Sequence, residues 1–414
     1  MKPSALLLVA AQLCFAAVGQ AQLRAISPQQ QAPLAGDALG SPGIDAGDYV
    51  YISGQGPGRQ DGTTPANFAD QVRQSLENIR TVVEASGLTM DHLVYVQVYL
   101  DDMGQYDGLN KAFADYFPKM PPARGILGAA RLPQSPIQIT GVAVRNLAGK
   151  QPVTPVNFKP NKAYSAGMLT HDRLFISSML GSDPSNDEVP DDPAAQVDLA
   201  LDRMKLVSEA AGLTLANMVF VNPYLTSDIP SRVMNERYAR RFEFGNTPGR
   251  ATIQVSSLPE GAHIAYTGVA VRDIAQRRSI RPKNMPPSPT ASPCVFAGDT
   301  LYCSAKSGFI PGPNGGVFAA TTANQARQTM RNLLDNLEEA DLKFDQVVST
   351  TIYLDDLSDT AEFGKVYRKY FGGLAPAETL VQQLRPADRK ADDDGRFPDL
   401  EQVSLIAVRT HPNH

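Results

Sequence analysis

The chain has 414 residues, of which 43% are hydrophobic and 20% charged, with a net charge of −5 and a pI near 5.6. This composition is typical of a soluble globular protein of two or three domains and excludes a largely disordered chain. An acidic chain predicts no nucleic-acid partner, and beyond the N-terminal segment no apolar run is long enough to predict a membrane partner.

The first 21 residues differ from the rest of the chain. Lys2 precedes an apolar run over residues 5–18, and small residues lead up to Ala21. This layout is typical of a secretory signal peptide over residues 1–21, and it predicts cleavage after Ala21 and a secreted or periplasmic protein. The alternative is a buried N-terminal helix.

Beyond this segment the chain repeats one unit three times. Each copy begins with a turn and an alternating strand that reaches a serine, in the sequences GDYVYISGQG (47–56), HDRLFISSML (171–180) and GDTLYCSAKS (298–307). A helix with an apolar face, a strand, a second short helix and two further strands follow in each copy. The pattern predicts an α+β fold of three tandem β-β-α-β-α-β-β units.

The sequence also predicts the boundaries of the units. They are expected at residues 36–148, 163–275 and 293–410, with the third unit degenerate. Residues 149–162 and 276–292 are rich in proline and lack periodicity, so they are predicted to be extended linkers.

A sheet with both helices on one face leaves its other face uncovered. Three such sheets packed inward around a three-fold axis cover one another, and one chain with three units can form this arrangement alone. We therefore expect a monomeric pseudo-trimer, because three separate domains would expose apolar sheet faces. An acidic, polar insertion at residues 386–399 is expected to lengthen the last hairpin of the third unit.

Cys294 and Cys303 flank a predicted hairpin whose turn is Gly298-Asp299. In this register the two cysteines face each other in a non-hydrogen-bonded pair, where side chains approach closely. A disulfide between them fits an oxidising compartment. Two reduced, half-buried cysteines are the alternative.

An arginine phrase recurs in the first two units, as PPARGILGAARL at 121–132 and TPGRATIQVSSLP at 247–259. Arg124 and Arg250 each follow a proline-marked bend, whereas the third unit has Glu378 at this position. A guanidinium presents a planar fork of donors that matches a carboxylate, so both arginines are candidates for binding a small anion. The alternative is a structural ion pair at a strand edge, because most surface arginines do no chemistry.

The segments YISGQ, LNKAFADYF, PPARGILGAARLP and QVRQSLENIRTVVEASGLTMDHLVYVQVYLDDM together resemble the RidA/YjgF family of reactive-intermediate imine deaminases, also called endoribonuclease L-PSP-like proteins. The resemblance is close over 47–147, clear over 164–273 and weaker over 294–410. It implies the RidA/chorismate-mutase-like fold. Because family members are usually one-unit chains that form homotrimers, it also implies an intramolecular pseudo-trimer with clefts between its units.

The resemblance implies hydrolysis of 2-imino or 2-enamino acids to 2-keto acids and ammonia. In the family the arginine binds the substrate carboxylate, which implies Arg124 and Arg250 as catalytic residues and a small carboxylate as substrate or ligand. It implies substrate-binding roles for a further set of positions: Tyr164, Ser53, Ser177, Asn110, Asn235 and Gln138. For the strand serines, the alternative is a small polar residue that simply fits a strand.

The copies depart from the family pattern. Gly40 and Ala291 stand where the second unit has the family tyrosine, Tyr164. The strand glutamate that helps to direct the water in the family is replaced in all three units, by Gln138, Ala265 and Gln402. A glutamine can hold a water molecule but cannot take its proton, and an alanine can do neither. The third unit also has Gly364 in place of the helix asparagine, so we expect at most two competent clefts.

No cofactor and no metal are expected. The five histidines show no metal-ligand spacing, and the glycine-rich SGQGPG at 53–58 lacks the lysine and the helix of a phosphate loop. Some members of the family are described as ribonucleases, but the acidic balance and the lack of a basic stripe argue against RNA binding here.

Three functional hypotheses follow. The first is weak hydrolytic deamination of imino acids or related small carboxylates at Arg124 and Arg250. The second is a non-catalytic binding protein that uses the same pockets as a sensor or scavenger, which the missing glutamate favours. The third is a structural or interaction role, which requires both arginines to be paired internally.

Overall fold

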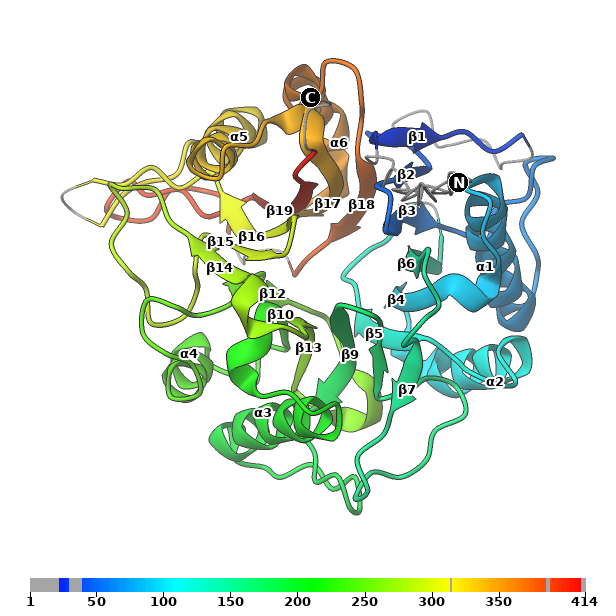
Figure 1. Cartoon of the computed structure of the whole chain (residues 1–414). Helices are drawn as coiled ribbons and strands as arrows, with labels where there is room; N and C mark the ends of the chain where they lie inside the picture. Colours follow the sequence, from blue (N-terminus) through cyan, green and yellow to red (C-terminus); the bar gives the residue numbers. More distant parts are fainter. Residues whose placement is uncertain (1–21, 30–38, 134, 313–314, 385–387, 411–414) are drawn as a thin grey trace, which may run out of the picture.

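The structure is a computed structural model, and it describes residues 22–29, 39–133, 135–312, 315–384 and 388–410. Over these residues the chain forms three mixed sheets, one for each unit of the repeat. The units form a ring in which the sheets lie toward the centre and the helices toward the outside (Figure 1). The predicted α+β fold with three tandem units is confirmed. The expected signal peptide lies outside the described residues.

The first unit has the predicted order of elements. They are β2 (Gly43–Asp45), β3 (Tyr49–Gln55), α1 (Phe68–Ala85), β4 (Leu93–Leu100), α2 (Tyr106–Tyr116), β5 (Ala123–Gly128) and β6 (Ile137–Val144). A short strand β1 (Arg24–Ile26) pairs with β2, and the sheet order is β1-β2-β3-β6-β4-β5. Only β4 and β5 are parallel neighbours in the described part of this sheet, because helix α2 connects them.

The second unit repeats this order with one break. Its elements are β8 (Gly167–Leu169), β9 (Arg173–Leu180), α3 (Pro193–Ala210), β10 (Met218–Leu225), α4 (Ser231–Ala239), β11 (Gly249–Arg250), β12 (Ile253–Gln254) and β13 (Ile264–Val271). Where the first unit has the continuous strand β5, the second has the two short strands β11 and β12, both parallel to β10.

The third unit follows the same plan. Its elements are β15 (Cys294–Ala297), β16 (Thr300–Ser307), α5 (Thr322–Glu339), β17 (Val347–Leu354), α6 (Thr360–Tyr367), β18 (Ala377–Gln382) and β19 (Glu401–Val408). The predicted insertion lies between β18 and β19. Its Arg389 forms ion pairs with Asp355, at 3.0 Å, and with Asp359, at 2.6 Å, which attach the insertion to its own unit.

The first helix of each unit begins at a side-chain cap and buries one face. The caps are Asn67, Asp192 and Thr321, whose side chains accept hydrogen bonds from backbone N–H groups of the first turn. In α1 the predicted apolar face, Val72, Leu76, Ile79 and Val83, is buried against the sheet. Short 3-10 helices lie at Met90–His92, Met103–Gln105, Leu215–Asn217, Pro259–Gly261, Ile274–Gln276, Phe344–Gln346, Leu357–Asp359 and Arg368–Tyr370.

Each segment predicted as a linker adds a short strand to a sheet. Strand β7 (Gln151–Val153) pairs with β8, and β14 (Arg277–Ile280) pairs with β15. Both lie at a sheet edge, where a proline-containing segment can pair along one side without disturbing the ladder. Each linker therefore supplies an edge strand to the sheet of the unit that follows it.

The inward faces of the sheets pack on one another. One buried cluster contains Tyr99 of β4, Tyr224 of β10 and Tyr353 of β17, one residue from each unit. Tyr224 also donates a hydrogen bond of 3.0 Å to Oε1 of Gln97 in the first unit. The ring therefore covers the apolar sheet faces that an isolated unit would expose.

Candidate functional site

The three units meet at three similar joints. At each joint a backbone N–H of one unit donates to the strand serine of the next: Arg124 to Ser177 at 2.7 Å, Arg250 to Ser304 at 2.8 Å, and Glu378 to Ser53 at 2.8 Å. Each serine hydroxyl donates in turn to a carbonyl twelve residues earlier, that of Ser165, Ser292 or Ser41. The strand serines thus hold neighbouring units together.

At the first joint the side chain of Arg124 is enclosed by two units. Its Nη2 donates to Oδ1 of Asn110 on α2, at 2.5 Å. The rings of Tyr106, Phe113 and Tyr164 lie 5.7, 5.0 and 4.7 Å from the guanidinium carbon. Tyr164 comes from the second unit, and only 1% of Arg124 is exposed. Asn110, Arg124 and Tyr164 are therefore brought together, as the resemblance implied.

The guanidinium of Arg124 is only partly satisfied. Its Nε and Nη1 are buried and have no hydrogen-bond partner among the described residues. Burial lowers the pKa of Arg124, while the phenols of Tyr106 and Tyr164 and the carboxylate of Glu260 act in the opposite direction. Nε and Nη1 lie on different edges of the guanidinium, so an anion that accepts from either one would stabilise the buried cation.

A cavity of about 390 Å³ lies beside this cluster and is lined by residues of the first two units. Tyr164 and Ser165 line it, whereas Arg124 does not. Tyr164 therefore lies next to both the cavity and the guanidinium. Arg203 of α3 and Glu260 of the turn before β13 also line the cavity.

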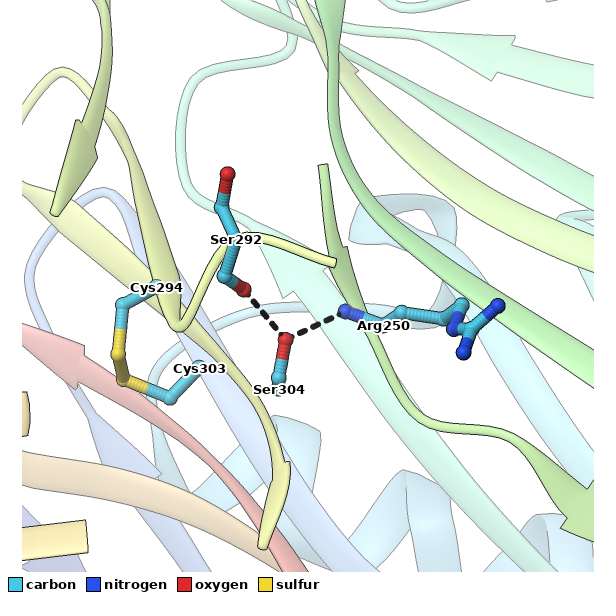
Figure 2. Close-up of a disulfide and its surroundings, with 5 residues drawn as sticks. All are labelled: Arg250, Ser292, Cys294, Cys303 and Ser304. Atoms are coloured by element: carbon cyan, nitrogen blue, oxygen red, sulfur yellow. Dashed lines mark hydrogen bonds between the residues drawn. A yellow bond between two sulfur atoms is a disulfide. The ribbon is translucent and has the colours of Figure 1, made fainter. Parts of the chain in front are cut away.

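The second joint holds Arg250 in a simpler setting. Its Nη1 donates to Oδ1 of Asn235 on α4, at 2.7 Å, and its guanidinium carbon lies 5.3 Å from the ring of Tyr238. Ala291 supplies no ring to cover it from the third unit, and Arg250 is less buried than Arg124. Burial lowers the pKa of Arg250 as well. Figure 2 shows the hydroxyl of Ser304 between the carbonyl of Ser292 and the amide of Arg250.

The third joint is filled by the chain itself. Leu39 of the first unit packs directly on Gly364, where a Cβ would come within 2.7 Å of Leu39 Cδ2. A Cβ on Gly40 would lie 2.7 Å from Cγ of Glu378, so the backbone also fills the space of the missing tyrosine. One oxygen of Glu378 is buried without a hydrogen-bond partner in the described chain, and burial raises the pKa of this carboxyl to about 7.

Two residues that the sequence grouped with the arginines lie elsewhere. Ser53 belongs to the third joint, where it contacts Glu378. Gln138 lies next to Gly54, the residue after Ser53, where a Cβ would come within 2.5 Å of its side chain. The Gln402 side chain is at the second joint, where it donates to the carbonyl of Thr252 at 3.2 Å. Gln402, on the last strand of the third unit, therefore lies at the joint between the second and third units rather than at the joint between the third unit and the first.

Sequence reasoning missed two charged residues that line the first cavity, Arg203 and Glu260. Glu260 lies in a turn, at φ 59°, and turn residues have no periodicity that marks them. The sequence does distinguish Arg203, because the aligned helix positions of the other two units are asparagines, Asn78 and Asn332.

The cysteine hairpin has the predicted register, with Cys294 opposite Cys303. A disulfide bond joins the two residues within the core of the third unit, close to the Ser304 contact (Figure 2). Among the described residues there is no group of three or more side chains suited to bind a metal ion. No helix in the described part of the chain has the length and apolar character needed to span a membrane.

The fold and the joints together define a class: a chain of three α+β units, with an arginine that can bind a carboxylate at two of its three joints. The chain belongs to the family described as endoribonuclease L-PSP, whose model matches residues 30–145, 154–271 and 284–387. The RidA/YjgF resemblance of the sequence is thereby confirmed.

The chain is also similar to individual proteins of this family. A RutC family protein of Pyrococcus horikoshii is 35% identical over 108 residues, which are 25% of this chain and 86% of that protein. A 2-iminobutanoate/2-iminopropanoate deaminase of Escherichia coli K12 is 36% identical over 108 residues, 25% of this chain and 84% of that protein. Each of these relatives therefore corresponds in length to one unit of the repeat.

Two solved structures show the same relationship in length. The YjgF gene product of E. coli is 32% identical and covers 30% of this chain and 99% of its own, with a TM-score of 0.28. The structure of E. coli TdcF with bound serine is 30% identical, with the same two coverages and a TM-score of 0.28.

Proposed function

We propose that the first cleft hydrolyses 2-imino or 2-enamino acids, or related small carboxylates, to the 2-keto acid and ammonia. The observation that carries the proposal is the buried guanidinium of Arg124, with Nε and Nη1 open and Asn110 fixing Nη2. The relative named as a 2-iminobutanoate/2-iminopropanoate deaminase supports this reaction class. The serine in the TdcF structure supports binding of a small molecule with a carboxylate.

In the proposed reaction Arg124 receives the substrate carboxylate on one of its open donors, Nε or Nη1. The carboxylate replaces the water that the guanidinium loses on burial, so binding offsets a desolvation cost already present in the empty cleft. Tyr164 has to turn away from Arg124 for the substrate to enter from the cavity, and it then covers the bound molecule. The imine carbon is already electrophilic, so the protein mainly has to orient the substrate and one water molecule.

A group is also needed to take a proton from the attacking water. The strand position of the family glutamate is Ala265 at this cleft, which cannot do so. Glu260 lines the cavity, and its carboxylate acts electrostatically on both Arg124 and Tyr164. Partial burial raises the pKa of Glu260, and Asp187 adds to the effect, while Arg203 and Lys159 oppose it; a higher pKa makes the carboxylate a stronger base. We assign the proton transfer to Glu260.

The reaction balances with these groups. The water oxygen forms a bond to the imine carbon, the C=N electron pair moves to nitrogen, and Glu260 takes a proton from the water. Glu260 then returns this proton to the amine nitrogen. The C–N bond breaks as the C=O bond forms, and the hydroxyl proton passes to the departing nitrogen, which leaves as ammonia.

The second cleft is expected to contribute less. Arg250 and Asn235 retain the carboxylate-binding pair, but Ala291 provides no aromatic cover. The last-strand residue at this cleft is Gln402, whose amide is already bonded to the carbonyl of Thr252 and to Gln383. A carboxylate bound there would be more hydrated. The strand position of the family glutamate carries no acid at this cleft, because it is Gln402.

The test is ammonia release from enzymatically generated 2-imino acids by the mature chain and by Arg124→Ala and Arg250→Ala. We expect Arg124→Ala to lose at least 100-fold in kcat/KM, because both the carboxylate anchor and the orientation are removed. Arg250→Ala should lose less than threefold. Arg232→Ala, an exposed arginine of α4 outside both clefts, is the matched control. No turnover by folded protein would refute the enzymatic proposal.

The alternative is a non-catalytic small-carboxylate binding protein. It is supported by the replacement of the strand acid in all three units, by Gln138, Ala265 and Gln402. A binding protein should be stabilised against heat by 2-keto acids without releasing ammonia from imines, since a ligand specific for the folded state raises its apparent stability. Loss of that stabilisation in Arg124→Ala would place the ligand in the first cleft.

We further propose that the protein acts outside the cytoplasm, as a monomer. The signal-like residues 1–21 and the Cys294–Cys303 disulfide support export, and the closed ring of three units leaves no joint for a further copy. N-terminal sequencing of the native protein should begin at Gln22, and light scattering should give the mass of one chain. Uncleaved protein in the cytosol would refute export.

A further inference from the structure

The lining of the first cavity includes a cation that the other units lack. Residue 203 lies on the first helix of the second unit, at the position that Asn78 and Asn332 hold in the first and third. Both asparagines donate to two backbone carbonyls of the loop before their helix, those of Gly56 and Gly58 or of Ser307 and Phe309. In the second unit this loop-fixing amide is replaced by a longer, charged side chain, Arg203.

Arg203 performs only part of the same structural role. Its Nη1 donates to the carbonyl and the hydroxyl of Ser182, at 3.3 and 2.9 Å, and the ring of Phe158 lies 5.0 Å from its guanidinium carbon. Only 8% of the residue is exposed. Its Nε is buried without a partner, and no hydrogen bond within the described residues reaches Nη2. The Nε–Nη2 edge, which matches both oxygens of a carboxylate, is therefore open.

Arg203 lines the cavity of the first cleft together with Tyr164. Burial raises the pKa of the Tyr164 phenol, and the charges of Arg124 and Arg203 oppose this effect. The guanidinium of Arg124 thus lies over the ring of Tyr164, and this ring lines the same cavity as Arg203.

The carboxylates near Arg203 do not neutralise its charge through a close ion pair. Asp187 is 3.7 Å from Nη1 but forms a shorter ion pair of 2.7 Å with Lys159. Glu260 is the other carboxylate on the wall, and Lys119 adds a third cation. With three cations and two carboxylates, the wall retains an excess of positive charge that a further anion would neutralise.

The size of the cavity is consistent with a second anchor. A volume of about 390 Å³ exceeds what a three- or four-carbon imino acid needs and lies in the range of sites for larger ligands. Resting on the proposed function, we infer that Arg203 forms a second anion-binding position, so that the substrate of the first cleft is a 2-imino acid whose side chain ends in a carboxylate. Arg124 binds the carboxylate next to the imine, and Arg203 binds the distal one.

The experiment compares imines made in situ from glutamate and from alanine by amino-acid oxidases. We expect kcat/KM for the dicarboxylic imine to exceed that for the monocarboxylic one by tenfold or more. Arg203→Met should remove this preference through a higher KM, leaving the monocarboxylic imine within twofold. Arg203→Asn repeats the test with the residue that the other two units have at this helix position, so it is expected to fold. Arg232→Met is the control.

A second readout separates this inference from the proposed function. The thermal stabilisation by 2-oxoglutarate and by pyruvate is measured for wild type, Arg203→Met and Arg203→Asn. Greater stabilisation by 2-oxoglutarate, lost in both variants, supports the second anion position even if no imine is turned over. Equal stabilisation by the two acids, or equal loss of both in the Arg203 variants, would overturn it.

Discussion

The backbone amide of Glu378 donates a hydrogen bond of 2.8 Å to the hydroxyl of Ser53, across 325 residues of sequence. This contact joins the last unit to the first and completes the ring. The equivalent contacts hold the backbone of Arg124 against Ser177 and the backbone of Arg250 against Ser304. The hydrogen bonds that hold the ring together therefore also set the positions of the two arginines.

Replacing Ser53 by alanine tests this contact at the joint that carries no arginine. The variant removes the acceptor for the Glu378 amide and the donor to the Ser41 carbonyl, both in a water-poor interface. We expect a loss of roughly 1–3 kcal/mol in the free energy of unfolding, measured by urea denaturation. Ser231→Ala, at an exposed position of α4, should change stability by less than about 0.5 kcal/mol. Equal stability of the two variants would contradict the role of Ser53.

Glu378 predicts a pH dependence of stability. Its pKa is raised by burial from 4.5 to about 7 in the folded protein, so the folded state binds a proton that the unfolded state has released. The stabilising contribution is therefore complete below about pH 4.5 and is lost as the pH rises through 7. We expect Glu378→Gln to flatten the fall in stability between these values, as measured by chemical denaturation at a series of pH values. Asp399, whose pKa is also raised to about 7, leaves a residual slope of the same sign.

Restoring the arginine at the third joint should not restore a cleft. Leu39 and Gly40 occupy the space that a ligand would need, and Gly364 supplies no asparagine to hold a guanidinium. We expect Glu378→Arg to lose roughly 3–5 kcal/mol of stability, because it buries an unpaired charge, and to gain no ammonia release. Glu378→Gln separates the loss of the acid from the burial of the new cation. A stable Glu378→Arg protein with added turnover would show that the third cleft can open.

Removing the disulfide should weaken the third unit. We expect the Cys294→Ser/Cys303→Ser double variant to be roughly 2–3 kcal/mol less stable, because the closed loop constrains the unfolded chain. A reducing agent should lower the unfolding midpoint of the wild type toward that of the variant and leave the variant unchanged. If the reductant has no effect on the native protein, the two cysteines are not joined in solution.

The elements of the fold were predictable because they repeat. The apolar face of α1 and the alternating strands occur three times, and an interpretation of one copy is checked by the other two. The Arg124 and Asn110 contact was predictable for a related reason, since both residues lie at fixed places on regular elements. The strands β7 and β14 were not, because pairing at a sheet edge needs no particular sequence pattern.

The remaining parts of the site depend on which unit faces which. The sequence placed Gln138 with the arginines, but it lies next to Gly54, the residue after Ser53. Leu39 fills the third cleft from a stretch without periodicity, where nothing local marks a buried residue. Arg203 and Glu260 reach the cavity of the first cleft through the packing of units, a property that no single unit carries.

The covalent connection of the three units has a consequence for how the ring forms. If the three units were three identical chains, the joints would dissociate on dilution. Any one substitution would then be present at all three joints. Here each unit sees its neighbours at a fixed effective concentration, so assembly is independent of how much protein is present. Each joint also carries its own sequence, so one joint can be filled by Leu39 and Glu378 while another keeps an arginine, Arg124.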